Sequence, residues 1–262
     1  MADSFKINDM KNVYYINHTS FKDGDTYKAM QFALNLCEED SNLKVLTFLV
    51  SSTSQCDSFL GELGFTRTQI KNHGFKTQNL EVKIHTLKTY DPDYLFVGNN
   101  PSEVLVAVGL TSEDLEKFED YTDIAHVIIV PWKIKELGQF LSIHEAMNID
   151  TFEKYQRPAD VDVRVKNAIN WLNVTSYPNE GYGHPSDSNR LKQMSNALKM
   201  QNVPLDYSSV VYCAINCGLI PSSARKTAES FVQAQSRLFA VGKDTDYNHL
   251  TKMMNTKEFT QY

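Results

Sequence analysis

Residues 45–54 of the chain are Val-Leu-Thr-Phe-Leu-Val-Ser-Ser-Thr-Ser, and this stretch decides the fold class. Its first six residues are apolar except Thr47, without the alternation of a strand that has one face in water. Such a run is typical of a parallel strand covered by helices on both faces. The last four residues are small and polar and stand where the strand ends. The stretch therefore predicts a central strand of an α/β sheet with polar side chains at its carboxyl end.

The same arrangement recurs at two other places in the first part of the chain. Residues 13–16 form a short apolar run that leads into Asn17, His18, Thr19 and Ser20. Residues 94–97 form another run that leads into Gly98, Asn99 and Asn100. Ligands of open parallel sheets bind outside the carboxyl ends of the strands. We therefore expect a ligand site at this edge of the sheet.

Helical spacing separates these strand-like runs. After the first run, apolar residues recur at intervals of three and four, at Tyr27, Met30, Ala33, Leu34 and Cys37. Further strands are expected at residues 80–87, at the edge of the sheet, and at residues 104–108 and 127–130. The alternation predicts a Rossmann-like α/β fold, with a mainly parallel sheet and flanking helices.

The last third of the chain has a different pattern. No strand-like alternation follows residue 186, and helices are expected over residues 186–200, 206–216 and 221–239. We predict an α/β Rossmann-like ligand-binding domain over 1–149, a linker with a short helix over 150–185, an all-α domain over 186–240, and a polar tail over 241–262.

Length and composition exclude several classes of protein. A chain of 262 residues can bury a core without disulfides, and its four cysteines are few for that length. The first ten residues are polar, and no apolar run approaches the roughly 20 residues that span a bilayer. We expect a cytoplasmic protein that does not enter a membrane.

The loop of residues 17–26 carries the candidate catalytic residues, His18, Asp23 and Asp25. A histidine there can exchange protons near neutral pH, and two carboxylates can orient it or hold a cation or a ribose diol. The alternative is that one of the aspartates only caps the following helix and that His18 is a solvated loop residue. No metal site is predicted.

Hydroxyl and amide side chains at the three strand ends are the ligand-binding candidates. They can bind phosphate or sugar oxygens, although Ser and Thr also cap helices. The candidates are Asn17, Thr19, Ser20, Ser51, Ser52, Thr53, Asn99 and Asn100. The chain contains no G-x-G-x-x-G, G-x-x-x-x-G-K-[ST] or G-x-S-x-G sequence, so dinucleotide, P-loop and α/β-hydrolase sites are not supported, and no cofactor is indicated.

The helical part contains two weaker motifs. Residues 212–226 have the ingredients of a helix-turn-helix, with Arg225 and Lys226 at the start of the second helix. In a recognition helix both side chains would be exposed. Cys213 and Cys217 lie one helical turn apart but lack two further metal ligands at a suitable spacing, so we expect them to pack in the core.

The function expected from these patterns is binding of a small polar or phosphorylated, nucleotide-like ligand at the carboxyl ends of the strands. Whether a reaction follows is open; in an enzyme, His18 would be the acid or base and the loop at residues 181–186 would close over the substrate. The alternative is a ligand-sensing regulator whose helical domain contacts a protein or DNA. We expect no duplex binding at physiological salt, because the chain is acidic overall, and we expect the helical domain to be a packing or oligomer surface.

Overall fold

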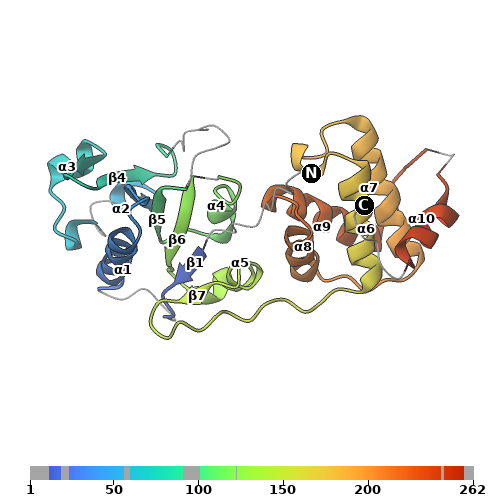
Figure 1. Cartoon of the computed structure of the whole chain (residues 1–262), viewed down its shortest axis with the longest axis horizontal. Coiled ribbons are helices and arrows are strands. Elements are labelled where there is room, and N and C mark those ends of the chain that lie inside the picture. The colour runs from blue at the N-terminus through green and yellow to red at the C-terminus, as the bar shows by residue number, and fades with distance from the viewer. Residues whose placement is uncertain are drawn as a thin grey trace. The chain divides into compact units, whose positions relative to one another are not determined.

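A computed structural model describes residues 12–18, 24–55, 60–90, 101–121, 123–242 and 245–256. The described chain forms two compact units that divide between Gln156 and Arg157. The first unit contains a sheet with helices, and the second is helical (Figure 1).

The first unit is built on a seven-stranded sheet with the order β3-β4-β2-β5-β6-β1-β7. The strands are β1 (Asn12–Tyr15), β2 (Val45–Val50), β3 (Gly74–Lys76), β4 (Glu81–Thr86), β5 (Glu103–Val108), β6 (Ile124–Val130) and β7 (Met147–Asn148). All neighbouring pairs are parallel except β3 and β4. The mainly parallel α/β sheet predicted from the strands at residues 13–16, 45–50, 104–108 and 127–130 is therefore confirmed.

Helices cover both faces of this sheet, because its central strands are apolar on both sides. Helix α1 (Asp25–Glu39) and the segment from Leu60 through α3 (Arg67–Lys71) pack on one face, over Phe48 and Val106. Helix α4 (Ser112–Glu116), the 3-10 helix η2 (Ile134–Leu137) and α5 (Gly138–Ile143) pack on the other, over Leu105 and Ile129. Figure 1 shows α1 on one side of the strands and α4 and α5 on the other.

The carboxyl ends of the central strands lie level with one another. Val50 pairs with Val108, and Val108 pairs with Val130. The chain leaves β1 on the face covered by α1, whereas it leaves the neighbouring strand β6 on the face covered by η2 and α5. In open α/β sheets, ligands bind where the chains that leave two neighbouring strands diverge in this way.

Two short strands differ from the sequence-based prediction. Residues 80–87 were expected at the edge of the sheet, but β4 is the second strand, because β3 pairs with it from outside. Strand β7, which lies beyond β1, was not predicted from the sequence. Strands of three and two residues are too short to have a recognisable alternation. The strand predicted at residues 94–97 lies outside the described residues.

The second unit consists of α6 (Val163–Thr175), the 3-10 helix η3 (Pro178–Glu180), α7 (Pro185–Met200), α8 (Tyr207–Asn216), α9 (Pro221–Ser236) and α10 (Tyr247–Met254). Helix α9 packs against both α7 and α8, while α10 packs against α6 and α7. Thus α6, expected within a linker, and α10, expected within a polar tail, both belong to this unit. A hydrogen bond links α6 to α10, since Nδ2 of Asn167 in α6 donates to the carbonyl of Met254 in α10 at 2.8 Å.

A buried tyrosine anchors the loop between η3 and α7. The hydroxyl groups of Tyr182 and Thr227 are 2.8 Å apart, and Lys226 donates to the carbonyl of Gly181. These contacts fasten the segment at residues 181–186 within the helical unit. That this segment closes over a substrate stays a prediction.

Tyr182 makes the stability of the helical unit sensitive to alkaline pH. Burial raises the pKa of Tyr182 to about 12, whereas a tyrosine in the unfolded chain ionises near pH 10. Below pH 10 the side chain is neutral in both states, and its full contribution to stability is present. Between pH 10 and about 12 the unfolded chain loses the proton while the folded state keeps it, so the free energy of unfolding falls as the pH rises. In denaturant unfolding at pH 9, 10 and 11, Tyr182→Phe should reduce this decline. Tyr177→Phe, which alters an exposed ring, should leave it unchanged; equal slopes for the two variants would contradict the assignment.

Candidate functional site

His18 and Asp25 meet at the carboxyl end of β1. The amide of Ile16 donates to the carbonyl of Ile129 at 3.1 Å, which holds the chain beside β6 as it leaves the sheet. Helix α1 begins at Asp25, after Gly24 turns the backbone with φ +89°. His18 Nδ1 lies 2.8 Å from Asp25 Oδ2. His18 and Asp25 are therefore in contact, while Asp23 lies outside the described residues.

The chemistry of this pair follows from its burial. The Asp25 side chain is only 4% exposed, whereas that of His18 is 24% exposed. An ionised carboxylate only accepts hydrogen bonds, so a bond from His18 to an ionised Asp25 requires the tautomer with the proton on Nδ1. Nε2 is then the ring nitrogen that can accept a proton from a ligand, or donate one when the ring is charged. A carboxylate that fixes the tautomer in this way is typical of histidines that transfer protons.

A second buried polar atom lies next to this pair. The Thr26 side chain is buried, and its Oγ1 forms no hydrogen bond within the described residues. Leaving such a group unsatisfied costs about 1–3 kcal/mol. The start of α1 therefore has a buried hydroxyl group without a hydrogen-bond partner among the described residues.

The predicted hydroxyl cluster after β2 bonds within itself. The amide and the hydroxyl of Ser51 both donate to Gln55 Oε1, and the hydroxyls of Ser52 and Ser54 are 3.0 Å apart. Thr53 begins the short helix α2 (Thr53–Gln55) and is exposed. These side chains therefore shape a tight turn at the end of the strand.

The two predicted clusters stand at separate positions along the edge. Strands β5 and β6 lie between β2 and β1, so three strand spacings, or roughly 14 Å, separate Ser51 from the end of β1. Asn17 is exposed beside His18. Four other candidates, Thr19, Ser20, Asn99 and Asn100, lie outside the described residues. That His18, Asp25, Ser51 and Asn99 line one concave surface stays a prediction.

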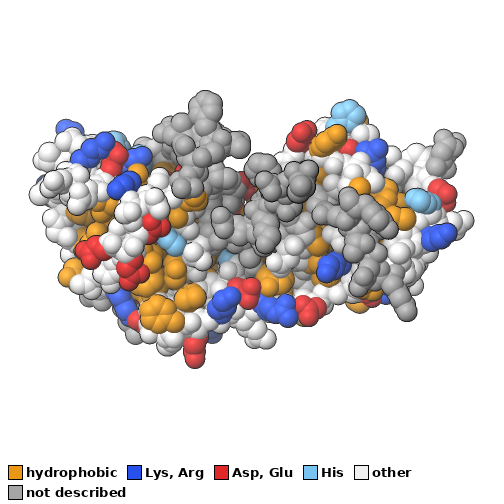
Figure 2. Space-filling view, viewed as in Figure 1, with side chains coloured by type: hydrophobic (Ala, Val, Ile, Leu, Met, Phe, Trp, Pro, Cys, Tyr) orange, Lys and Arg blue, Asp and Glu red, His pale blue; other side chains and the backbone are white. Residues whose placement is uncertain are grey.

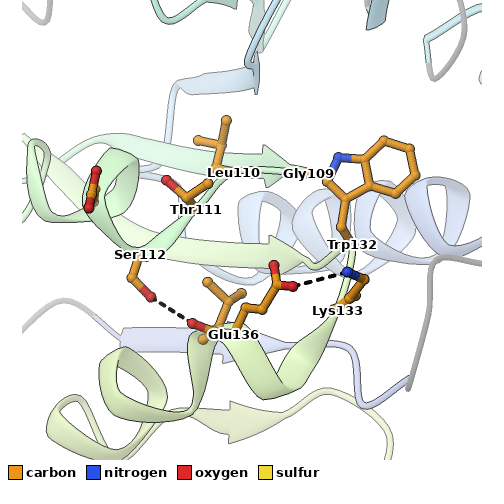
Figure 3. A pocket seen from close by; sticks show the side chains of 9 residues that line it. Gly109, Leu110, Thr111, Ser112, Trp132, Lys133 and Glu136 are labelled. Atoms are coloured by element: carbon orange, nitrogen blue, oxygen red, sulfur yellow. Dashed lines mark hydrogen bonds and ion pairs between the residues drawn. The ribbon is translucent and has the colours of Figure 1, made fainter.

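A cavity of about 320 Å³ lies at the ends of the two intervening strands. It is lined by residues 109–113, which follow β5, and by Trp132, Lys133, Glu136 and Leu137, which follow β6. Ser112 Oγ donates to the Glu136 carbonyl at 3.1 Å, and Lys133 Nζ lies 3.1 Å from Glu136 Oε1. Figure 3 shows these two contacts beneath the indole of Trp132, at the carboxyl ends of the strands.

Gly109 gives the Trp132 indole its place. The backbone of Gly109 has φ +65°, and a Cβ there would lie 2.6 Å from Trp132 Nε1. A side chain at this position would therefore force the indole to move. This cavity was not predicted from the sequence, because it joins residues that follow two different strands. The feature of the sequence that could have indicated the cavity is a glycine directly after one predicted strand and a tryptophan shortly after the next.

The helical unit does not meet the condition for a recognition helix. Arg225 is buried within α9, together with Ala224, Ala228 and Phe231. Lys226 is exposed, but its Nζ bonds to the carbonyl of Gly181. On the face seen in Figure 2, described basic side chains of this unit lie scattered among acidic ones rather than in a stripe. Helix α9 is thus a central packing helix of its unit.

The cysteine pair of the helical unit is only partly buried. Cys213 and Cys217 are free thiols that hydrogen-bond to each other. This bond, with burial, raises the pKa of Cys213, and it lowers the pKa of Cys217. Across the described ranges, no group of three or more His, Cys, Asp and Glu side chains is arranged to hold a metal ion. In the same part of the chain, no helix has the length and apolar character of a bilayer span.

Comparisons with models of known families, with curated proteins and with solved structures found no match. The function is therefore inferred from the geometry at the carboxyl ends of the strands.

Proposed function

We propose that this chain binds a small polar ligand, phosphorylated or nucleotide-like, at the carboxyl edge of the sheet through Nε2 of His18. The observation that carries the proposal is the 2.8 Å contact between His18 Nδ1 and the buried Asp25. Asp25 orients the ring, and the quarter-exposed His18 presents its other nitrogen to the ligand. The position agrees with a Rossmann-like placement of ligands, where the chains leaving β1 and β6 diverge.

Thr26 supports the same location. Its buried, unbonded Oγ1 lies in the first turn of α1, next to Asp25. A ligand bound to His18 could donate a hydrogen bond to this hydroxyl or accept one from it. His18 and Thr26 would then both contribute to binding. The hydrogen bond from the ligand to Thr26 Oγ1 would remove the cost of an unsatisfied buried oxygen.

The same pair favours acid-base chemistry as a second candidate function. A neutral imidazole whose Nδ1 is held by a carboxylate can take a proton on Nε2 from a ligand hydroxyl and return it later. The proposal includes a cytoplasmic location, which the free thiols of Cys37, Cys213 and Cys217 support.

Replacement of His18 by Asn tests the proposal. The Asn amide can still donate a hydrogen bond towards Asp25, so the unliganded protein should keep nearly its full stability, but the variant has no equivalent of Nε2. Thermal unfolding would be measured with inorganic phosphate, ribose 5-phosphate and AMP. A probe present at 100 times its dissociation constant should stabilise the wild type by about 2.7 kcal/mol, and His18→Asn should lose most of that gain.

His249→Asn is the matched control, because His249 is an exposed histidine in the helical unit. It should respond to each probe as the wild type does. A His18→Asn protein that keeps the whole stabilisation would contradict the role of Nε2. Absence of stabilisation of the wild type by all three probes at millimolar concentration would contradict the proposed ligand class.

A further inference from the structure

The cavity at the ends of β5 and β6 combines a partly exposed indole with an apolar base. Trp132 is 45% exposed, although it lines a hollow of about 320 Å³. Leu110 and Leu137, which line the same hollow, are buried. Pockets for small molecules begin at about 300 Å³ and are lined mainly by apolar and aromatic groups with a few polar ones. This cavity therefore has the size and lining for one small ring system.

The position of the indole is set by the backbone. Gly109 lies against the Nε1 edge of Trp132, where any Cβ would overlap it. The indole thus stands over the end of β5 (Figure 3). Because one edge is held by the backbone of the sheet, the ring loses less conformational freedom when a ligand stacks on it.

Charge around the cavity limits the ligand further. Its charged side chains are Lys133, Glu113 and Glu136, and Lys133 already pairs with Glu136. The balance is one negative charge, which disfavours a phosphate or carboxylate in the cavity and tolerates a neutral or cationic group. A flat, uncharged or cationic ring with polar edges suits both the aromatic lining and the negative charge of the cavity. Such a ring can stack on the indole and hydrogen-bond to the polar rim.

We propose that this cavity binds an uncharged or cationic planar heteroaromatic ring, of the nucleobase class, by stacking on Trp132. The site is distinct from His18: Trp132 leans towards β5, whereas His18 follows β1 on the opposite side of β6. The inference therefore does not depend on the function proposed for His18.

Trp132 can report its own occupancy. The chain has two tryptophans, so Trp171→Phe leaves Trp132 as the single indole fluorophore. Adenosine, uridine and nicotinamide would be titrated into this protein, with ribose as a non-aromatic control. Adenosine is expected to quench the emission saturably, because its base covers the indole face, and ribose to have no effect. AMP should bind several-fold more weakly than adenosine because of Glu113 and Glu136.

Three variants would be measured by calorimetry, which does not need the fluorophore. Trp132→Ala should weaken adenosine binding about tenfold to a hundredfold, the range expected for one stacked base. Trp132→Phe keeps a ring face and should retain most of the affinity. Gly109→Ala should weaken binding without removing the indole, because the new Cβ displaces it.

Several results would overturn the proposal. No saturable change with adenosine, uridine or nicotinamide at millimolar concentration would exclude the ligand class, and equal affinity of Trp132→Ala would exclude stacking. Binding of ribose as tight as that of adenosine would exclude recognition of the ring. His18→Asn should bind adenosine like the wild type, so failure here and failure of the His18 site remain distinguishable.

Discussion

Replacing Glu119 by Ala should lower the free energy of unfolding of the sheet unit by about 3–5 kcal/mol. Glu119 Oε1 lies 2.6 Å from His144 Nε2, and the two side chains are only 2% and 9% exposed. Removing one member of a buried, hydrogen-bonded pair leaves its partner without compensation in a medium of low dielectric constant. Denaturant unfolding of the wild type and the variant at pH 7 measures the difference.

A double-mutant cycle separates the pair from simple loss of packing. His144→Ala should cost a similar amount, and the double variant should cost clearly less than the two single changes together, because the first change already removes the interaction between the two side chains. Lys133→Ala is the control, since the Lys133–Glu136 pair is more than 60% exposed on both sides and should contribute no more than about 1 kcal/mol. Additive costs for Glu119 and His144 would show that the pair does not act as a unit.

Gly74→Ala should detach β3 from the sheet. Gly74 has φ +131°, and a Cβ there would lie 2.0 Å from the carbonyl oxygen of Val82 and 3.0 Å from Cα of Lys83. Both are backbone atoms of β4, so no side-chain movement can relieve the overlap. We expect rapid hydrogen exchange at the amides that pair β3 with β4, and a loss of about 1–3 kcal/mol of stability, the usual cost of a strained backbone position.

Gly61→Ala is the matched control for that change. Gly61 lies in a helical turn of the same unit, and its Cβ would meet no atom within 4 Å. This substitution should be neutral or stabilise the protein by about 0.4–1 kcal/mol, because alanine restricts the unfolded chain. If Gly74→Ala has the same effect as Gly61→Ala, the close approach of β3 to β4 is not as described.

The central strands could be predicted because their physics is local. The run from Val45 to Val50 is buried on both faces, and its composition alone indicates this. The outer strands could not be predicted, because Gly74–Lys76 and Met147–Asn148 are too short to have a pattern of their own. They form strands because they pair with β4 and β1. The same limit explains α10, whose role depends on a contact between Met254 and Asn167 that no local pattern encodes.

The candidate site was accessible to prediction only in part. His18 and Asp25 flank one loop, so their meeting follows from a strand that leads directly into a helix. The distance between Ser51 and His18 depends on the order of the strands in the sheet. No local pattern in the sequence indicates that β5 and β6 lie between β2 and β1. For the same reason the cavity beside Trp132 was missed, because it needs two loops that are neighbours in the sheet but not in the chain.

The place of β1 in the sheet has a consequence for how the chain reaches its native state during synthesis. This strand is made first, yet it is an inner strand whose two neighbours, β6 and β7, begin at Ile124 and Met147. While the ribosome produces the intervening residues, β2, β4 and β5 can pair with one another, but β1 has no partner. Strand β1 can pair only after β6 has been made, and closure of such a long loop is slow. The nascent chain therefore carries an apolar strand without its sheet partner until Val130 has been made, about halfway along the 262 residues, and the bond between Ile16 and Ile129 that leads into the His18 site can form only then.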